Sequence, residues 1–477
     1  MTFDLLVTDA TVVNADGRTR AHVGVTDGVV TALLSACSAP PAAVRTLDAA
    51  GRLLLPGGVD GHCHVDQVTG AYASLDTYEI ATVGALHGGT TTILDFGIPA
   101  DAGERPIDAL RRKLDLTRGA RCDVGLHGSV VTWDDTVPGQ LDEMAGLGVR
   151  SVKLYTTNRG TTMADDDTIL RVMREMVRLG GLAIVHSEHD AIVVDRTAAC
   201  AADDHVGIED LHRTRPEISE DASVREILAV ASYTGAPVYF VHQTTPGAVD
   251  AVAEARARGQ VVLSETCPHY LLLDDAVYSS ATPEKYACCP PVRPRAAADG
   301  LLARLGRGAV DVVSSDHSCY DLAQKREHRH DVRRMPHGLP GVETRMPAAY
   351  TAMVTRAGLP VERFVEAFST APARVHGLPT KGAVAVGYDA DLVLLDPDES
   401  RVVDGSRLHQ GTDFSPFDGM ELRGWPSTVV AGGSVVLDEG TFHDPGPVGR
   451  YRERTAFRDP ARRSADPVLG AVVGAAR

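Results

Sequence analysis

One unit, a short apolar run followed by a polar loop and a helical pattern, recurs eight times in this 477-residue sequence. Strands that alternate with helices indicate a parallel sheet, because each helix carries the chain back to the edge where the next strand starts. Eight such units within about 320 residues fit a closed (β/α)8 barrel. The predicted strands cover residues 53–62, 90–97, 122–131, 149–157, 181–188, 236–243, 260–268 and 310–317.

The two ends of the chain follow a different pattern. The first 50 residues alternate short β-like runs with turns at Asp16-Gly17 and Asp27-Gly28, which is typical of a small antiparallel sheet. Similar runs, "DADLVLLDP" and "PSTVVAGGSVVLDEG", return near the C-terminus. We therefore expect a small β-sandwich domain built from residues 1–54 and 379–444, a barrel from residues 55–378, and a tail from residues 445–477.

Composition limits the partners that such a chain can have. The net charge of −17 argues against a surface for nucleic acid or for anionic membranes. The start, "MTFDLLVTDATVV", carries Asp4 where a signal peptide needs an unbroken apolar stretch, and no apolar run is long enough to predict a membrane span. The eight cysteines are scattered and do not suggest a disulfide framework. These features favour a cytoplasmic enzyme with reduced thiols.

Polar side chains gather where the predicted barrel strands end, which is where (β/α)8 barrels carry their active sites. His62 and His64 are two residues apart in a strand, so their side chains face the same side. Four histidines and one carboxylate are good ligands for zinc or a similar first-row ion. The sequence thus predicts a metal centre at this rim, formed by His62, His64, Lys153, His186, His242 and Asp316.

Lys153 is the unexpected member of this set. A divalent cation would repel its ammonium group, and burial together with the cation lowers the pKa of the side chain and favours the neutral amine. A neutral amine can add carbon dioxide to become a carbamate, an anion with two oxygens. Such a group can bridge two cations at the spacing of about 3.5–4 Å that two-metal sites use.

Several longer motifs point to one family. They include "PGGVDGHCHVD", "VKLYTTNRGTTMADDDT", "VHSEH", "SETCPHYLLL", "KYACCPPVRP" and "GLPGVETRMP". In these motifs the chain resembles the cyclic amidohydrolases of the amidohydrolase superfamily, in their hydantoinase/dihydropyrimidinase branch. The resemblance covers nearly the whole chain, including the returning β segments near the C-terminus.

The resemblance implies two divalent metal ions, with zinc expected, and a homo-oligomer, either a tetramer or a dimer. His62 and His64 would bind one ion together with Asp316, and His186 and His242 the other, while carboxylated Lys153 bridges both. A hydroxide held between the ions would attack the amide carbon of a small cyclic amide, and Asp316 would carry the proton to the leaving nitrogen. The product would be an N-carbamoyl amino acid or a similar ring-opened acid.

The sequence departs from the family at positions expected to contact the substrate. The family's oxyanion-donating tyrosine, five residues after the lysine, is Asn158 here, while Tyr155 takes the place of an apolar aromatic residue. An Asn amide still donates hydrogen bonds. Cys289 replaces the serine whose backbone holds the ring amide, and His337 replaces a pocket asparagine.

Other activities stay open at this point. Dihydroorotase is disfavoured because no cation sits where a substrate carboxylate would be held. Allantoinase remains an alternative because that group also lacks the tyrosine, and cyclic imides are a third substrate class. A non-catalytic relative that has lost metal ligands is disfavoured, since all six ligand positions are intact.

Overall fold

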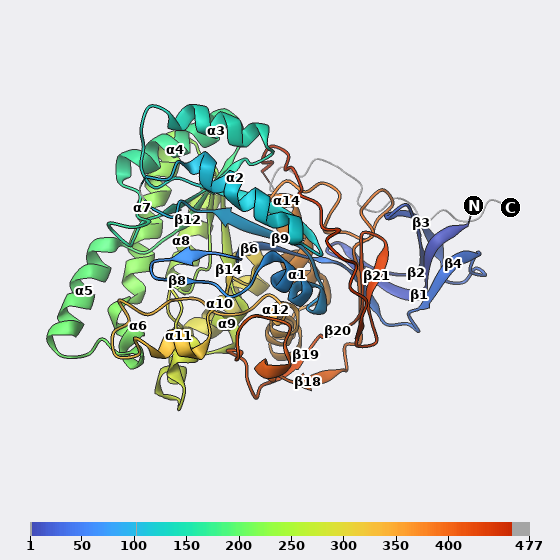
Figure 1. The fold of residues 1–477 in the computed structure, drawn as a ribbon. Coiled ribbons are helices and arrows are strands. Elements are labelled where there is room, and N and C mark those ends of the chain that lie inside the picture. The colour runs from blue at the N-terminus through green and yellow to red at the C-terminus, as the bar shows by residue number, and fades with distance from the viewer. Residues whose placement is uncertain (1, 102, 460–477) are drawn as a thin grey trace.

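The computed structural model of the chain describes residues 2–101 and 103–459. Two large sheets organise the molecule (Figure 1). One is entirely parallel and curls into a barrel that helices surround, and the other joins strands from both ends of the chain beside it. This arrangement confirms the predicted barrel with a small β domain.

The barrel contains the eight predicted strands in sequence order. The eighth is split, and its two pieces close the barrel because β15 pairs with β14 and β16 pairs with β6. Residues 314–316 lie in the break between these pieces. The strands are β6 (Gly58–His64), β9 (Thr90–Gly97), β10 (Asp123–Ser129), β11 (Ser151–Tyr155), β12 (Leu182–His186), β13 (Val238–Phe240), β14 (Val262–Thr266), β15 (Val312–Val313) and β16 (His317–Ser318).

Helix α4 (Asp166–Leu179) shows how the sequence forms the outer layer. Its buried residues Ile169, Val172, Met173 and Met176 occupy positions i, i+3, i+4 and i+7, so they line one face of the helix. The side chain of Asp165 caps the first turn, and Gly180 ends the helix with φ of 60°.

The barrel region contains further α-helices, and several of them are only four to six residues long. They are α1 (Tyr78–His87), α2 (Pro106–Leu116), α3 (Val137–Gly146), α5 (Asp190–Ala202), α6 (Leu211–Thr214), α7 (Glu217–Thr234), α8 (Pro246–Ala257), α9 (Pro268–Leu272), α10 (Arg295–Gly306), α11 (Leu322–Arg326), α12 (Arg345–Tyr350), α13 (Val361–Val365) and α14 (Ala371–Val375).

The second sheet joins N-terminal to C-terminal strands, with β5 and β17 paired at the junction. It consists of β1 (Phe3–Asn14), β2 (Gly17–Thr26), β3 (Val29–Ser35), β4 (Ala43–Asp48), β5 (Leu53–Pro56), β17 (Leu392–Leu395), β20 (Pro426–Ala431), β21 (Ser434–Asp438) and β22 (Thr441–Phe442). Strands β18 (Ser400–Val402) and β19 (Glu421–Arg423) form a separate pair. The sheet is mixed, because β1 runs parallel to β4 and β5 and antiparallel to β2.

The start of the first predicted barrel strand was placed wrongly. The apolar run 53–56 forms β5, which belongs to the second sheet, and the barrel strand begins only at Gly58. The expected division between residues 54 and 55 therefore falls inside β5. The chain changes sheets at Gly57, where there is no space for a side chain: a Cβ there would lie 2.2 Å from the Thr91 hydroxyl oxygen.

The described part of the C-terminal tail packs against the barrel of its own chain. Val124 of β10 exchanges backbone hydrogen bonds with Arg450 and Arg452. Arg454 is buried and donates to the Ser151 hydroxyl at 2.7 Å. Residues 460–477 lie outside the described part of the chain.

Two further observations concern the described residues. None of their helices combines the length and the apolar character that crossing a membrane requires. All eight cysteines fall within this part of the chain, and each has a free thiol.

Candidate metal centre and active site

The six predicted metal ligands come together at the C-terminal ends of the barrel strands. His62 and His64 end β6, Lys153 lies in β11 and His186 ends β12. His242 follows β13 by two residues, and Asp316 lies in the break between β15 and β16. Every one of these side chains therefore reaches the same end of the barrel.

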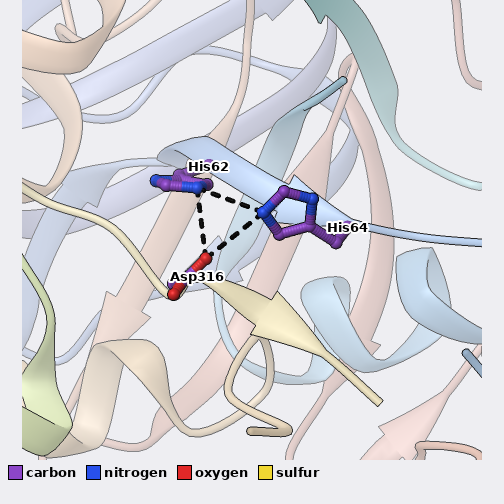
Figure 2. Close-up of side chains that lie close together, drawn as sticks. All are labelled: His62, His64 and Asp316. Carbon is purple, nitrogen blue, oxygen red and sulfur yellow. Dashed lines mark hydrogen bonds and ion pairs between the residues drawn. The ribbon is translucent and has the colours of Figure 1, made fainter. Parts of the chain in front are cut away.

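The tightest group consists of His62, His64 and Asp316 (Figure 2). The Nε2 atoms of the two histidines lie 3.2 Å apart. Asp316 Oδ1 is 3.1 Å from Nε2 of His62 and 3.4 Å from Nε2 of His64. The Nζ atom of Lys153 lies 3.4 Å from His62 Nε2. Three ligand atoms and the lysine nitrogen thus converge on one small volume.

Glu265 of β14 sets the proton position on His62. Its Oε1 atom lies 2.7 Å from His62 Nδ1, so the ring carries its proton there and keeps a lone pair on Nε2. The same carboxylate accepts the backbone N–H of His242 at 3.0 Å and the Tyr239 hydroxyl at 2.6 Å. Sequence reasoning missed Glu265, because a single glutamate within a strand has no distinctive spacing.

His186 and His242 form the second group, with ring centroids 4.6 Å apart. Glu188 Oε2 lies 2.8 Å from His186 Nε2 and so fixes that ring as Glu265 fixes His62. The Nδ1 atom of His242 is buried and has no hydrogen-bond partner among the described residues. A buried nitrogen without a partner lowers the stability of the fold unless an ion or a ligand binds it.

The electrostatics favour the forms of these side chains that bind metals. Burial lowers the pKa of His64, of His186 and of His242, which keeps their rings neutral at neutral pH. Burial also lowers the pKa of Lys153 to about 8. Burial acts to raise the pKa of Asp316, but its interactions with His62 and His64 outweigh this effect and hold the pKa well below its usual range.

Backbone strain marks the same rim. His242 has φ of 39° and Asp316 has φ of 51°, a left-handed conformation that side chains other than glycine rarely adopt. Strained residues of this kind persist where the surrounding structure holds them, and they concentrate at functional sites. Both strained residues come shortly after a barrel strand ends, His242 after β13 and Asp316 after β15.

The donor set fits two divalent cations. Imidazoles and carboxylates are the ligands that zinc and similar ions take, and the carboxylates of Glu265 and Glu188 orient the rings of His62 and His186. The lone pairs of His62 and His64 and the Asp316 carboxylate would repel one another without a cation between them. Lys153 is wholly buried, and the lowered pKa that burial gives it makes the neutral amine, the form that takes up carbon dioxide, easier to reach.

A hydrogen-bonded chain links the expected substrate residue Asn158 to the predicted metal ligand His186. Arg215 donates from Nη2 to Asn158 Oδ1 at 3.1 Å and from Nη1 to Glu188 Oε2 at 2.6 Å. Glu188 in turn holds His186. The sequence did not predict that the cation of Arg215 lies at this place. Glu188 balances the charge of Arg215. Asn158 itself has φ of 70°, which asparagine tolerates better than most residues do.

The other expected substrate contacts lie around this chain of residues. The Tyr155 ring lies 5.4 Å from the ring of His186, and Cys289 Sγ lies 3.1 Å from Glu188 Oε2. Burial raises the pKa of Cys289 well above its ordinary value, so its thiol is not activated as a nucleophile. His337 is half-buried, and its Nε2 has no partner within the described part of the chain.

The barrel fold and the histidine-rich rim define an amidohydrolase, and the comparisons with known proteins agree. Residues 53–436 match the amidohydrolase family. A D-hydantoinase of Ralstonia pickettii is 36% identical over 461 residues, which cover 95% of this chain and 100% of that protein. A D-phenylhydantoinase of Escherichia coli O9:H4 (strain HS) is 34% identical over 96% of this chain and 99% of its own length.

A solved structure of a D-hydantoinase superposes with a TM-score of 0.92 at 35% identity and covers 96% of this chain and 100% of that one. A dihydropyrimidinase from Brevibacillus agri also gives 0.92, at 32% identity, over 95% of this chain and 99% of its own. The chain belongs to the amidohydrolase family and to its hydantoinase/dihydropyrimidinase branch.

Proposed function

We propose that the protein is a metal-dependent hydrolase that opens the C–N amide bond of a cyclic amide of the hydantoin or dihydropyrimidine type. The product is an N-carbamoyl amino acid or a similar ring-opened acid. The observation that carries the proposal is the convergence of His62, His64 and Asp316, with Lys153 beside them, at the barrel rim. The names of relatives that match over the full length support the substrate type.

Two divalent ions, zinc in our proposal, would supply a nucleophilic water at neutral pH and polarise the amide carbonyl when bound. His62, His64 and Asp316 would hold one ion and His186 and His242 the other, with carboxylated Lys153 between them. Glu265 and Glu188 keep His62 and His186 in the correct tautomer. Asp316, whose carboxylate faces the reacting centre, takes the proton from the attacking water and gives it to the leaving ring nitrogen.

Asn158 contacts the substrate carbonyl in this proposal. Because Arg215 donates to Asn158 Oδ1, the amide oxygen is engaged and the NH2 group is the part that is left to donate. That NH2 group has one long contact, 3.4 Å to the Thr162 hydroxyl, which a substrate oxygen can replace. Arg215 is therefore a positioning residue that decides which end of the amide the substrate meets.

Asn158→Tyr should raise turnover of hydantoin or dihydrouracil relative to the preferred substrate of the wild type, because a phenol reaches further than the amide. Asn158→Phe is the matched control, since it imposes the same left-handed strain without the hydroxyl. Relative kcat/KM values across the substrates give the readout. If tyrosine and phenylalanine change the ranking equally, or if neither changes it, residue 158 does not set substrate choice.

Arg215→Ala should lower kcat/KM by about 10- to 100-fold, the effect expected from losing charge-assisted hydrogen bonds. Millimolar guanidinium should restore part of the rate by filling the vacated space. The loss should be smaller in an Asn158→Ala background, because the two residues act through one contact. Arg159→Ala, which removes a more exposed arginine next to Asn158 in the sequence, is the control. Equal losses in both backgrounds would show that Arg215 does not act through Asn158.

A panel of hydantoin, dihydrouracil, allantoin and succinimide, tested on metal-reconstituted protein, identifies the ring. The replacement of tyrosine by Asn158 specifically favours testing allantoin and cyclic imides as alternatives. We expect at least one ring to be opened, with plain hydantoin and dihydrouracil slow. Failure on all four would support a non-catalytic relative and contradict the proposal.

The proposal includes a homo-oligomer, tetramer or dimer, in the cytoplasm. The free thiols support a reducing compartment, and the family resemblance supports the assembly. Light scattering coupled to size-exclusion chromatography gives the mass of the assembly directly.

A further inference from the structure

A second set of metal-binding side chains lies outside the active site. His87 is the last residue of α1, Glu343 lies just before α12, and His409 lies in the loop after the 3-10 helix η7 (Gly405–Arg407). One ligand atom from each of these three residues lies within 4.8 Å of those from the other two. We call these three residues the outer cluster.

The outer cluster differs from two other ligand groups in the described chain, which already contain a cation. Lys381 pairs with all three carboxylates of the group Asp123, Asp389 and Asp391. Arg215 occupies the group of His186, Glu188 and Cys289. No such cation pairs with Glu343 among the ion pairs of the described residues, where its partner is His409.

Two glycines bring the outer cluster together. A Cβ on Gly84 would lie 2.7 Å from the backbone oxygen of His409, and one on Gly88 would lie 2.3 Å from the backbone oxygen of Glu343. Both distances are shorter than a side chain allows, so the His409 loop and the Glu343 segment approach the end of α1 only because these positions are glycine. Close backbone packing thus holds together the three segments that carry the outer cluster, namely the end of α1, the Glu343 segment and the His409 loop.

The side chains are arranged unusually for a cluster without a ligand. The rings of His87 and His409 stack with centroids 3.4 Å apart and planes 8° apart. Aromatic rings disfavour this face-to-face arrangement, so some other interaction has to hold the pair. Glu343 is buried, and it accepts the backbone N–H of His409 at 2.6 Å while its other oxygen lies 3.1 Å from His409 Nδ1.

The local charges favour a cation. A buried carboxylate and the C-terminal end of a helix, which carries partial negative charge, meet at His87. Burial, together with His409, lowers the pKa of His87 to about 4, so this ring is neutral. The hydrogen bond to Glu343 raises the pKa of His409. Arg401, the other nearby cation, pairs with Glu399 at 2.6 Å.

We propose that His87, Glu343 and His409 form a divalent transition-metal site, of the zinc class, that is separate from the catalytic centre. Two imidazoles and a carboxylate are a common ligand set for zinc, and water completes the coordination. Binding requires the His87 ring to rotate until its lone pair meets those of the other two ligands. The ion ties the His409 loop and the α12 segment to α1, and so holds the C-terminal chain on the barrel.

Counting bound Zn2+ by equilibrium dialysis and elemental analysis tests this site. His87→Ala and His409→Ala are compared with His443→Ala, which removes an exposed histidine one residue beyond Phe442, the residue that stacks on His87. We expect wild type and His443→Ala to bind one more ion per chain than either cluster variant. All four proteins should open the ring at the same rate, because none of the three cluster residues is a predicted ligand of the catalytic metals or a predicted substrate contact.

Equal ion counts in wild type and both cluster variants would overturn the proposal. If an alanine variant does not fold, His87→Gln and Glu343→Gln keep the size of the side chain and replace it. These readouts do not depend on turnover, so they stand apart from the proposed hydrolase activity.

Discussion

Replacing Asp316 by asparagine is expected to lower the rate of ring opening by about 10²–10⁴-fold, the usual contribution of general acid–base catalysis. The amide keeps the shape of the side chain but cannot accept the proton from the attacking water. Asp316 contacts both His62 and His64. It is only one of the six predicted ligands, however, so at least one metal ion should remain bound through the others. Steady-state kinetics and metal analysis of the same preparation measure both effects.

Glu327→Gln is a suitable control for Asp316→Asn, because Glu327 is an exposed carboxylate in the segment after the eighth strand. This variant should keep wild-type activity. An Asp316→Asn protein that retains more than about a tenth of the wild-type rate would remove Asp316 from the proton transfer.

The second large effect is expected at Lys153. Lys153→Ala should lower the number of bound metal ions and abolish ring opening, because the buried bridging group is lost. Small carboxylic acids such as acetate or propionate should restore part of both, since a free carboxylate can take the place of the carbamate. Metal content and rate are measured with and without the added acid.

Lys285→Ala removes a lysine that pairs with Asp418 and is not a predicted metal ligand, and it should change neither quantity. A Lys153→Ala protein that holds the same metal as wild type, or that does not respond to any small acid, would show that Lys153 has a purely structural role.

The barrel, and the gathering of the six candidate ligands at its rim, could be predicted because both follow from local patterns. Eight apolar runs with helical segments between them define the strands, and the first polar residue after a strand reaches the C-terminal rim. The run 53–56 was assigned to the wrong sheet because a four-residue apolar strand looks the same in either one. Only long-range pairing with β1 and β17 assigns it to the small domain.

The supporting residues could not be predicted, since their partners are distant in the sequence. Glu265 lies 203 residues from His62, and Arg215 lies 57 residues from Asn158. Neither residue has a spacing that distinguishes it from an ordinary surface or core position. The outer cluster likewise needs three segments that only the folded chain brings together.

The central claim is that the protein opens a cyclic amide with metal ions bridged by carboxylated Lys153. Measuring ring opening before and after metal removal tests this claim most directly. Protein dialysed against a chelator is assayed with the ring that the panel identifies, then reloaded with Zn2+ and bicarbonate, separately and together. We predict that the dialysed protein is inactive and that metal with bicarbonate restores full activity, because Lys153 needs carbon dioxide to bridge the ions. Full activity in protein shown to be free of metal would contradict the account.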